Sequence, residues 1–363
     1  MDESDEGAKI KIFQIAERLS KTLILADKAY LLAAEPMQGQ VGGKSISKKP
    51  VLTLPPNFIL KPLRNDVRGF RETAFYEAIR ESLERTKEKG GEISWKSLKQ
   101  KFNITSVSFD RPDIVCALQG YRTSSTRRYS NLLSVEESML LRKLTSLQLI
   151  SNYFGVVKLP QNTFTNSTPQ SYLILTDATS NFRKPCVMDL KMGQKTFEPD
   201  APPAKKAREI KKYPLQHELG FRIVGMRTFE PETVEYHYYD KKFGRSLISQ
   251  ELVREAFSRF FPSIHPRGKL ISGILLVLNE LKEWLEENKL FAFYASSLLL
   301  VFEGGNGISS SCNYNVKMID FAHVRKERGG DTGYLYGVEK LMVILKSLLS
   351  NERHMSKSHG VEA

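Results

Sequence analysis

An acidic and a basic residue stand two positions apart in an otherwise apolar segment of the chain. Asp189 and Lys191 lie within residues 185–193 (PCVMDLKMG), which have the composition of a buried β-strand. Residues two apart on a strand point to the same face, so the two side chains would lie side by side. Their burial costs free energy unless each has a partner, which could be the other residue, a ligand or a metal ion. A structural ion pair is the commoner explanation for such a strand.

A second pair of opposite charges, Lys61 and Glu72, has the arrangement that kinases use to hold nucleotide phosphates. Lys61 ends an apolar strand predicted from Phe58, and Glu72 lies on a helix predicted from Gly69 onwards. In kinases a helix glutamate orients a strand lysine, which then binds the α- and β-phosphates. Lysine–glutamate pairs are also common on protein surfaces, so the spacing alone does not decide the function.

Two later apolar segments end or begin with oxygen-bearing side chains. Ser296 and Ser297 open a predicted strand over 296–303, and Asp320 follows the apolar run of a predicted strand over 316–323. An aspartate at a strand end beside a cleft is well placed to bind a hard cation such as Mg²⁺. Most aspartates in this position simply form turns, so the metal interpretation needs further support.

Positive charge is concentrated directly after the Asp189 strand. The 363-residue chain has a net charge of +13, and residues 183–212 contain nine Lys and Arg against four Asp and Glu. Four of the cations fall on roughly one side of a helix predicted over 203–212: Lys205, Arg208, Lys211 and Lys212. Such a run is either a solvated face or a surface that binds phosphates. Because the sequence has no helix-turn-helix, RRM, KH or zinc-finger signature, no stable nucleic-acid complex is expected.

The composition is that of an ordinary globular protein, with 41% hydrophobic and 26% charged residues. No apolar run approaches the roughly 20 residues that span a bilayer, and the acidic start is unlike a signal peptide. The three cysteines are far apart and form no zinc-binding pattern. We therefore expect a cytoplasmic or nuclear protein that is neither secreted nor transmembrane and that binds no zinc.

Hydrophobic periodicity predicts alternating helices and strands along the chain. The predicted helices cover 8–34, 69–83, 94–102, 135–150, 203–212, 244–261, 269–288 and 334–349. The predicted strands cover 51–54, 58–60, 154–159, 172–175, 185–192, 221–229, 233–239, 296–303 and 316–323. We expect an N-terminal helical extension (1–40), an N-lobe (41–176) with an insertion at about 86–150, a C-lobe (177–350) and a disordered tail (351–363).

These motifs, in this order, resemble the inositol polyphosphate kinase family. The family's P-x-x-x-D-x-K-x-G signature is met by Pro185, Asp189, Lys191 and Gly193. Residues 296–299 (SSLL) and 319–322 (IDFA) resemble two further family motifs. The resemblance covers about residues 40–350, apart from 86–150. Within the family the multikinases are the most similar branch, on account of KYPL at 212–215 and FGRSL at 243–247.

The resemblance implies an α+β, two-lobed, kinase-like fold with antiparallel sheets and an ATP cleft between the lobes. ATP and Mg²⁺ are the implied cofactors, and the implied catalytic residues are Lys191, Asp189 and Asp320. The implied ATP site consists of Lys61, Glu72, Thr176, Ala178 and Asp189, and the implied metal ligands are Asp320 and Ser297. The residues implied to hold an inositol phosphate, in a segment at 194–215 and around it, are Arg68, Lys191, Lys205, Lys212 and His323.

The implied activity is ATP-dependent phosphorylation of inositol tris- and tetrakisphosphates by a monomeric enzyme. A trisphosphate 3-kinase and a hexakisphosphate kinase are the nearest alternatives. A more remote alternative is a non-catalytic basic scaffold that binds nucleic acid or phosphoinositide. The sequence neither supports nor excludes phosphatidylinositol bisphosphate as a further substrate.

Overall fold

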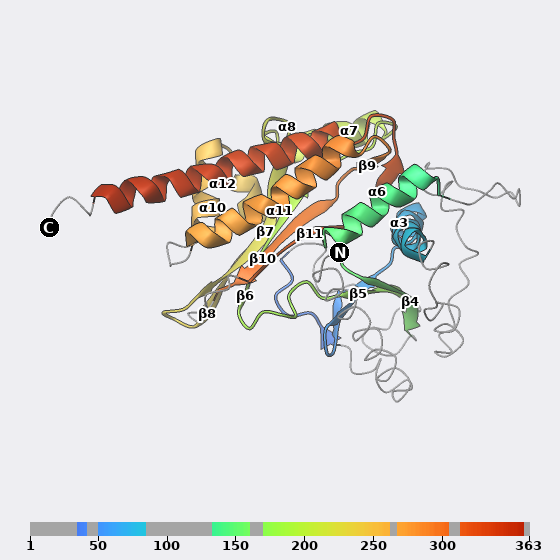
Figure 1. The fold of residues 1–363 in the computed structure, drawn as a ribbon, viewed down its shortest axis with the longest axis horizontal. Coiled ribbons are helices and arrows are strands. Elements are labelled where there is room, and N and C mark those ends of the chain that lie inside the picture. Colours follow the sequence, from blue (N-terminus) through green and yellow to red (C-terminus); the bar gives the residue numbers. More distant parts are fainter. Residues whose placement is uncertain are drawn as a thin grey trace, which may run out of the picture.

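Two antiparallel β-sheets with helices packed on them make up most of the computed structural model (Figure 1). The structure describes residues 35–41, 50–84, 133–159, 170–261, 267–304 and 313–358. This arrangement confirms the predicted α+β class with antiparallel sheets. The helices predicted over 8–34 and 94–102 lie outside the described residues. None of the helices in the described ranges has both the length and the apolar character needed to cross a membrane.

The N-terminal sheet has five strands in the order β1-β2-β3-β5-β4. They are β1 (Glu35–Pro36), β2 (Leu52–Leu54), β3 (Phe58–Pro62), β4 (Tyr153–Leu159) and β5 (Gln170–Thr176). The predicted hairpin is present, since Leu52 pairs with Leu60 and Leu54 with Phe58. Helix α3 (Val67–Glu84) follows β3 and packs against α6 (Val135–Ser146).

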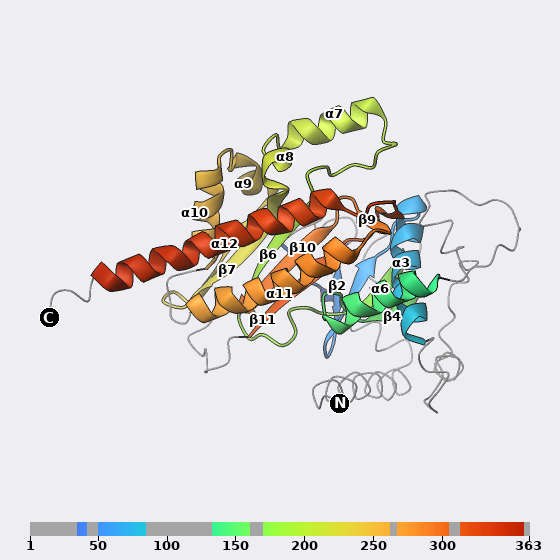
Figure 2. The ribbon, with the colours of Figure 1, turned by 45° about the horizontal axis from the view of Figure 1, so that its top comes forward.

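The C-terminal sheet has five strands in the order β11-β10-β6-β7-β8. They are β6 (Pro185–Met192), β7 (Phe221–Glu230), β8 (Glu235–Tyr239), β10 (Ser297–Glu303) and β11 (Tyr314–Ile319). Strand β6 is central and pairs Leu190 with Leu298 of β10. Helices α11 (Arg267–Glu287) and α12 (Thr332–Ser358) lie side by side along this sheet (Figures 1 and 2).

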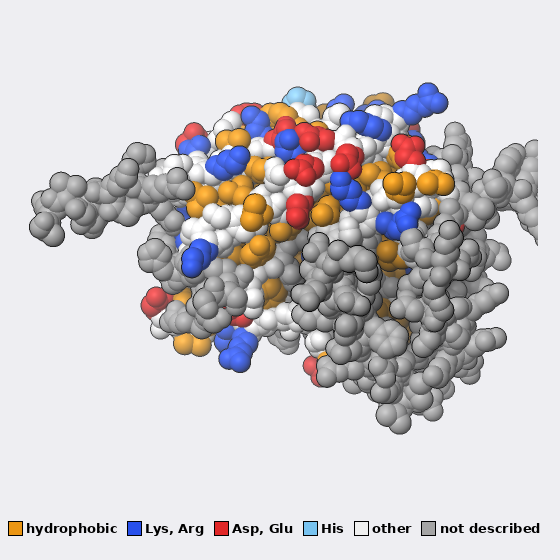
Figure 3. All heavy atoms as spheres, in the orientation of Figure 1, with side chains coloured by type: hydrophobic (Ala, Val, Ile, Leu, Met, Phe, Trp, Pro, Cys, Tyr) orange, Lys and Arg blue, Asp and Glu red, His pale blue; other side chains and the backbone are white. Residues whose placement is uncertain are grey.

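The two faces of the C-terminal sheet differ in chemistry. The residues that alternate with Asp189 and Lys191 are fully buried in the core: Met188, Leu190 and Met192. Asp189 and Lys191 therefore point to the opposite face. Over α11 and α12 the molecular surface carries acidic and basic side chains interspersed (Figure 3), so the positive excess is not gathered there.

Shorter elements complete the described chain. They are α7 (Pro203–Lys212), α8 (Gln216–Leu219), α9 (Lys241–Ser246), α10 (Gln250–Phe260), β9 (Phe291–Phe293) and β12 (Val324–Lys326). Strands β9 and β12 pair with each other. Helix α7 has the predicted bounds, contains no buried residue and lies apart from the α11 and α12 layer (Figure 2).

Two predicted elements have different bounds in the structure. The single helix predicted over 244–261 is two helices, α9 and α10, because Ser249 caps a new helix by accepting a hydrogen bond from the Leu252 N–H. The strand predicted to reach His323 ends at Ile319, since the next residue, Asp320, is left-handed. Helix α12 runs to Ser358, beyond the tail boundary expected after residue 350.

The described part of the expected insertion, residues 133–150, belongs to the hydrophobic core. Leu141 and Leu144 of α6 are fully buried, and the Trp284 indole donates a 2.9 Å hydrogen bond to the Leu140 carbonyl. Ser134 and Glu137 form a capping box at the start of α6. Residues 85–132 lie outside the described ranges.

Helix α12 crosses the turn before β7 without room for a side chain. A Cβ atom on Gly337 would lie 2.2 Å from the Gly220 carbonyl oxygen, and one on Gly220 would lie 2.6 Å from the Gly337 Cα. Gly220 also has a φ of 70° and ends α8, a conformation that favours glycine. The pair of glycines therefore sets how closely α12 packs against the end of the β6–β7 connection.

We expect Gly337→Ala to lower the free energy of unfolding. Alanine gains about 1 kcal/mol in helix propensity, but overpacking against backbone costs about 1 to 3 kcal/mol, so the net effect is destabilising. Urea denaturation measures the difference. Val343→Ala, at a side chain that is 63% exposed on the same helix, serves as the control. A Gly337→Ala protein that is more stable than the wild type would contradict this packing.

Candidate active site

Lys61 lies between carboxylates that come from different parts of the fold. Its Nζ atom is 2.6 Å from Glu72 Oε1 on α3 and also contacts Asp320 Oδ1 at the end of β11. Burial acts to lower the pKa of Lys61, but the negative charges of Asp320 and Glu72 outweigh it and raise the pKa. The predicted Lys61–Glu72 pair is thus present. The same ammonium also joins the N-terminal sheet to the C-terminal sheet.

Asp320 is held in a conformation that few residues adopt. Its φ is 66°, in the left-handed region, where aspartate and asparagine are the most tolerated after glycine. Glu72 Oε1 also accepts a 3.3 Å hydrogen bond from the Phe321 N–H, which fixes the next residue. Burial acts to raise the pKa of Asp320, but Lys61 and Lys191 outweigh it and lower the pKa. The carboxylate is therefore charged, and 40% of the side chain is exposed.

Asp189 and Ser297 place two buried oxygen atoms near this carboxylate. Ser297 of β10 is paired with Lys191 of β6, so it lies on the same face of the sheet as Asp189. Asp189 Oδ1 and Ser297 Oγ are both buried without a hydrogen bond. Burial and the charge of Asp320 raise the pKa of Asp189 to about 6, against the opposing effect of Lys191. Unsatisfied buried oxygens are costly, which favours a bound partner at this point.

Lys191 has a backbone partner rather than an acidic one. Its Nζ atom donates a 2.7 Å hydrogen bond to the carbonyl of Ala295, which has a φ of 53°. No ion pair joins Asp189 to Lys191 in the described part of the chain, so the structural ion pair weighed from the sequence is not formed. Burial lowers the pKa of Lys191, while Asp320 and Asp189 act in the opposite direction.

The donor set fits a magnesium ion that is bound together with phosphates. The described residues contain no group of three or more His, Cys, Asp and Glu side chains that could hold a metal ion by themselves. Mg²⁺ is usually bound by one or two carboxylates and completes its shell with phosphate oxygens and water. Asp320 supplies an accessible carboxylate, and the unpartnered Ser297 oxygen lies on the adjoining strand.

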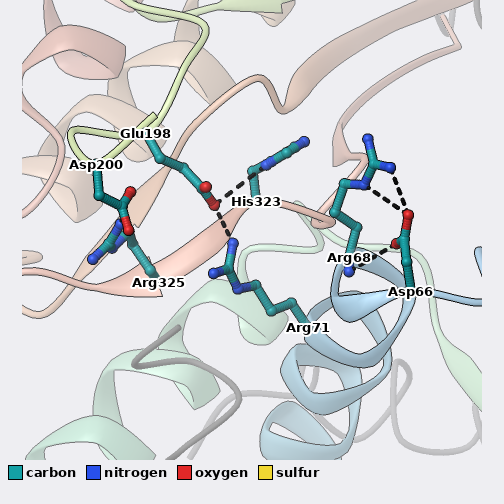
Figure 4. A network of polar contacts seen from close by, with 7 residues as sticks. All are labelled: Asp66, Arg68, Arg71, Glu198, Asp200, His323 and Arg325. Atoms are coloured by element: carbon teal, nitrogen blue, oxygen red, sulfur yellow. Dashed lines mark hydrogen bonds and ion pairs between the residues drawn. The ribbon is translucent and has the colours of Figure 1, made fainter. Parts of the chain in front are cut away.

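A second charged cluster surrounds the segment that follows β6 (Figure 4). Glu198 Oε1 contacts Arg71 on α3 and lies 3.3 Å from Nδ1 of His323. Nearby, Arg325 forms a 2.8 Å ion pair with Asp200. Cations and anions of three separate chain segments therefore meet beside Asp320.

The residues predicted to bind inositol phosphates are only partly brought together. Arg68 is paired with Asp66, with 3.1 Å between Nε and Oδ2 (Figure 4). Lys205 is close enough to Glu198 that its charge helps to lower the pKa of that carboxyl group. Lys212 lies at the other end of α7, where it pairs with Glu209.

Thr176 and Ala178 lie where the chain passes from one sheet to the other. The Thr176 hydroxyl accepts a 2.9 Å hydrogen bond from the Asn152 N–H. The Ala178 carbonyl accepts a 2.7 Å hydrogen bond from the Asn315 side chain on β11. The connection between the two sheets is therefore tied to both of them.

Two groups that hold the end of β6 were not predicted from the sequence. Gln216 Nε2 donates to the carbonyls of Gly193 (2.7 Å) and Lys191 (3.2 Å), and its Oε1 accepts from Arg222. The Ala295 carbonyl is the second group, and no side-chain pattern could have found it. An arginine inside the apolar run 219–226 was the only sign of the Gln216–Arg222 pair.

An open cavity of about 760 Å³ lies beside the turn that follows Ala178. It is lined by residues of β11, α11 and the turn after α6, among them Gln148, Glu280, Tyr314 and Lys317. None of the predicted site residues lines it.

About half of the chain is similar to inositol polyphosphate kinases. Residues 172–346 match the family model of inositol polyphosphate kinase. The chain is 36% identical over 158 residues to inositol polyphosphate multikinase from Homo sapiens, which covers 43% of this chain and 36% of that protein. It is 32% identical over 205 residues to inositol hexakisphosphate kinase 3 from Mus musculus. That match covers 50% of this chain and 52% of the relative. Residues 172–346 are therefore similar in sequence to the inositol polyphosphate kinase family.

The matches do not extend over the whole of these relatives. The chain spans about a third to a half of the length of the curated proteins that it matches. Among solved structures, inositol phosphate multikinase Ipk2 from S. cerevisiae, in complex with ADP and Mn²⁺, is 23% identical. That match has a TM-score of 0.47 and covers 56% of this chain and 93% of the other.

We expect Asp189→Asn to stabilise the folded protein at neutral pH. The pKa of Asp189 is about 6 in the folded protein, against an ordinary value of 3.8. As pH rises, the Asp189 carboxyl group therefore loses its proton in the unfolded chain before it does so in the folded protein. The free energy of unfolding of the wild type therefore falls between about pH 4 and pH 6 and stays lower above about pH 6. Asparagine does not titrate, so the free energy of unfolding of the variant does not fall in this range. At pH 7.5 it should exceed that of the wild type by up to about 3 kcal/mol.

Urea denaturation at pH 4 and pH 7.5, in buffer with a chelator, measures this difference. Asp200→Asn is the matched control, because Asp200 is an aspartate whose side chain is 64% exposed. An advantage of Asp189→Asn that shrinks as pH rises would contradict the burial of an unpaired carboxylate at this position.

Proposed function

We propose that this chain transfers a phosphoryl group from ATP to a hydroxyl group of an inositol polyphosphate. The observation that carries the proposal is the position of Lys61, whose single ammonium faces both Glu72 and Asp320. Asp189, Lys191, Ser297, Asp320 and His323 all fall within the stretch that matches the kinase family. The relatives named above, a multikinase and a hexakisphosphate kinase, support the same class of reaction.

In this proposal the nucleotide binds between the two sheets. Lys61, oriented by Glu72, contacts the ATP phosphates, Asp189 faces the ribose, and Thr176 and Ala178 face the base. A magnesium ion bound by Asp320 and Ser297 would supply positive charge to the β- and γ-phosphates. Phosphoryl transfer of this kind asks the protein mainly for positioning and for charge neutralisation.

Lys191 is proposed to face the transferred group. Its Nζ atom has one hydrogen bond to the Ala295 carbonyl, and an ammonium has three hydrogens to donate. The remaining hydrogens can bind the phosphoryl oxygens as charge develops on them. Fixing Nζ through a carbonyl rather than through Asp189 leaves the positive charge of the lysine available.

The acceptor is proposed to lie on the basic side of the cleft. Arg68, Lys205, Lys212 and His323 would hold its phosphates by charge-assisted hydrogen bonds. Arg68 is 38% exposed, so an incoming phosphate can reach it in competition with Asp66. Inositol tris- and tetrakisphosphates, the substrates of a multikinase, are the proposed acceptors.

A hexakisphosphate kinase is the second candidate. The matched stretch in the relative of that name is longer, at 205 residues against 158 for the multikinase. A trisphosphate 3-kinase activity and an activity on phosphatidylinositol bisphosphate are further outcomes of the same test. We expect a monomer in the cytoplasm or nucleus, with an N-lobe over 41–176, a C-lobe over 177–350 and no stable nucleic-acid complex.

The test is to identify the product. The purified protein is incubated with ATP labelled at the γ-phosphate, Mg²⁺ and a panel of inositol phosphates that carry three to six phosphates. Anion-exchange chromatography then separates the labelled products. Label in tetrakis- and pentakisphosphates supports the multikinase, whereas label only in a pyrophosphate product supports the second candidate. No labelled inositol phosphate from any acceptor would overturn the proposal.

We expect Lys191→Ala to reduce phosphoryl transfer at least about a hundredfold while the protein remains folded, because a charge on the transferred group is then no longer neutralised. Lys317→Ala is the matched control. Lys317 lies on β11 of the same sheet and likewise donates to a backbone carbonyl, that of Gln148, but it is not among the residues proposed to bind nucleotide, metal or acceptor.

Initial rates measured for both variants decide the role of Lys191, and circular dichroism checks that both are folded. Equal losses in the two variants would assign the effect to the removal of any lysine bound to a backbone carbonyl of this sheet. Full turnover by Lys191→Ala would remove Lys191 from the mechanism.

A further inference from the structure

Helix α7 carries the basic residues of the proposed acceptor site, yet it has no hydrophobic anchor of its own. None of its residues is buried, and Ile210 is 57% exposed. Its C-terminal end is fixed by Tyr213, which is buried and donates a 2.8 Å hydrogen bond to the Leu247 carbonyl. Its N-terminal end must therefore be positioned by the segment that leads into it, residues 193–202.

That segment is fixed at Glu198. The carboxylate contacts Arg71 on α3, which lies 127 positions away in sequence, and His323 just after β11. We call Glu198, Arg71 and His323 the Glu198 cluster (Figure 4). Two neighbours of Glu198, Thr196 and Ala201, are buried, so the segment is packed on both sides of this contact.

The Glu198 cluster is a buried interaction and not a surface ion pair. The Arg71 side chain is 6% exposed and that of Glu198 is 12% exposed. Burial acts to raise the pKa of Glu198, but His323 and Arg71 outweigh it and lower the pKa to about 2. Removing one partner of such a pair leaves the other charge buried without compensation, which strongly disfavours the packed geometry.

Glu198 also sets the orientation of the His323 ring. Nδ1 of the ring lies 3.3 Å from Glu198 Oε1, so the other ring nitrogen faces away from the carboxylate. A carboxylate partner on one ring nitrogen is a common way to fix what the other nitrogen can bind. One carboxylate thus acts on two parts of the proposed acceptor site, the His323 ring and helix α7.

We propose that Glu198 is a positioning residue that sets acceptor recognition by holding α7 and His323 in a fixed relation, without touching the acceptor. This inference rests on the proposed function, because it assigns α7 and His323 to the acceptor. It extends that proposal because it makes selectivity for the acceptor depend partly on the Glu198 carboxylate. Composition alone would assign this selectivity to the cations of α7.

A competing role for Glu198 is to occupy the cations that would otherwise bind phosphate. Burial of Arg71 disfavours this role, since an acceptor phosphate cannot reach a guanidinium that is 6% exposed. The two roles predict opposite effects. Loss of a positioning residue weakens acceptor binding, and loss of a competitor strengthens it.

The test compares Glu198→Gln with Asp200→Asn. Both variants neutralise an acidic residue of the same segment, but the Asp200 side chain is 64% exposed, and exposed ion pairs contribute little. Steady-state kinetics with the whole protein gives KM for ATP and for the inositol phosphate acceptor separately. Hydrogen exchange of the amides of residues 203–212, measured by mass spectrometry, reports on α7 directly.

For Glu198→Gln we expect KM for the acceptor to rise about tenfold, KM for ATP to stay within about twofold, and exchange in 203–212 to become faster. Asp200→Asn should match the wild type in all three. Unchanged exchange and unchanged KM in Glu198→Gln, or a lower KM for the acceptor, would overturn the inference.

The two proposals fail in different ways. If the wild type transfers no phosphoryl group to any acceptor, the proposed function fails. Hydrogen exchange then decides whether Glu198 positions α7, because that measurement needs no turnover. Faster exchange caused equally by Asp200→Asn would assign the effect to general loss of charge and overturn the special role of Glu198.

Discussion

The ammonium group of Lys61 is the interaction on which the site depends. It is shared by Glu72, on the helix that follows the N-terminal sheet, and Asp320, at the end of the edge strand of the C-terminal sheet. Two carboxylates and one ammonium carry a net negative charge. A divalent cation can therefore bind a carboxylate, and nucleotide phosphates can bind Lys61, without leaving a charge unpaired. The strained backbone of Asp320 persists because Glu72 also holds the next residue through the Phe321 N–H.

The two faces of the C-terminal sheet have different roles. The helices cover the face that carries Met188 and Leu190, which leaves Asp189, Lys191 and Ser297 directed toward the other side. Their burial has a cost, seen in the raised pKa of Asp189 and in two oxygen atoms without hydrogen bonds. A structure that served stability alone would have filled these positions with apolar side chains. The structure therefore argues against a structural ion pair between Asp189 and Lys191.

The sequence predicted those parts of the fold and site whose signals are local. The Lys61–Glu72 pair follows from a strand end and the next helix, and the bounds of α7 follow from Pro203 and the charge run that ends at Lys212. The break between α9 and α10 was missed, although Ser249 is a typical capping residue, because the apolar periodicity continues on both sides of it. Contacts such as Arg71 with Glu198, or Lys191 with the Ala295 carbonyl, join distant segments or a backbone group, so no spacing in the sequence indicates them.

The role proposed for Asp320 is tested by the affinity for ATP with and without Mg²⁺, determined by isothermal titration calorimetry on the wild type and on Asp320→Asn. We propose that the Asp320 carboxylate binds the metal and that Lys61 binds the phosphates. We therefore expect Mg²⁺ to tighten ATP binding to the wild type by at least about tenfold and to have little effect on the variant. Equal dependence on Mg²⁺ in the two proteins would contradict the account.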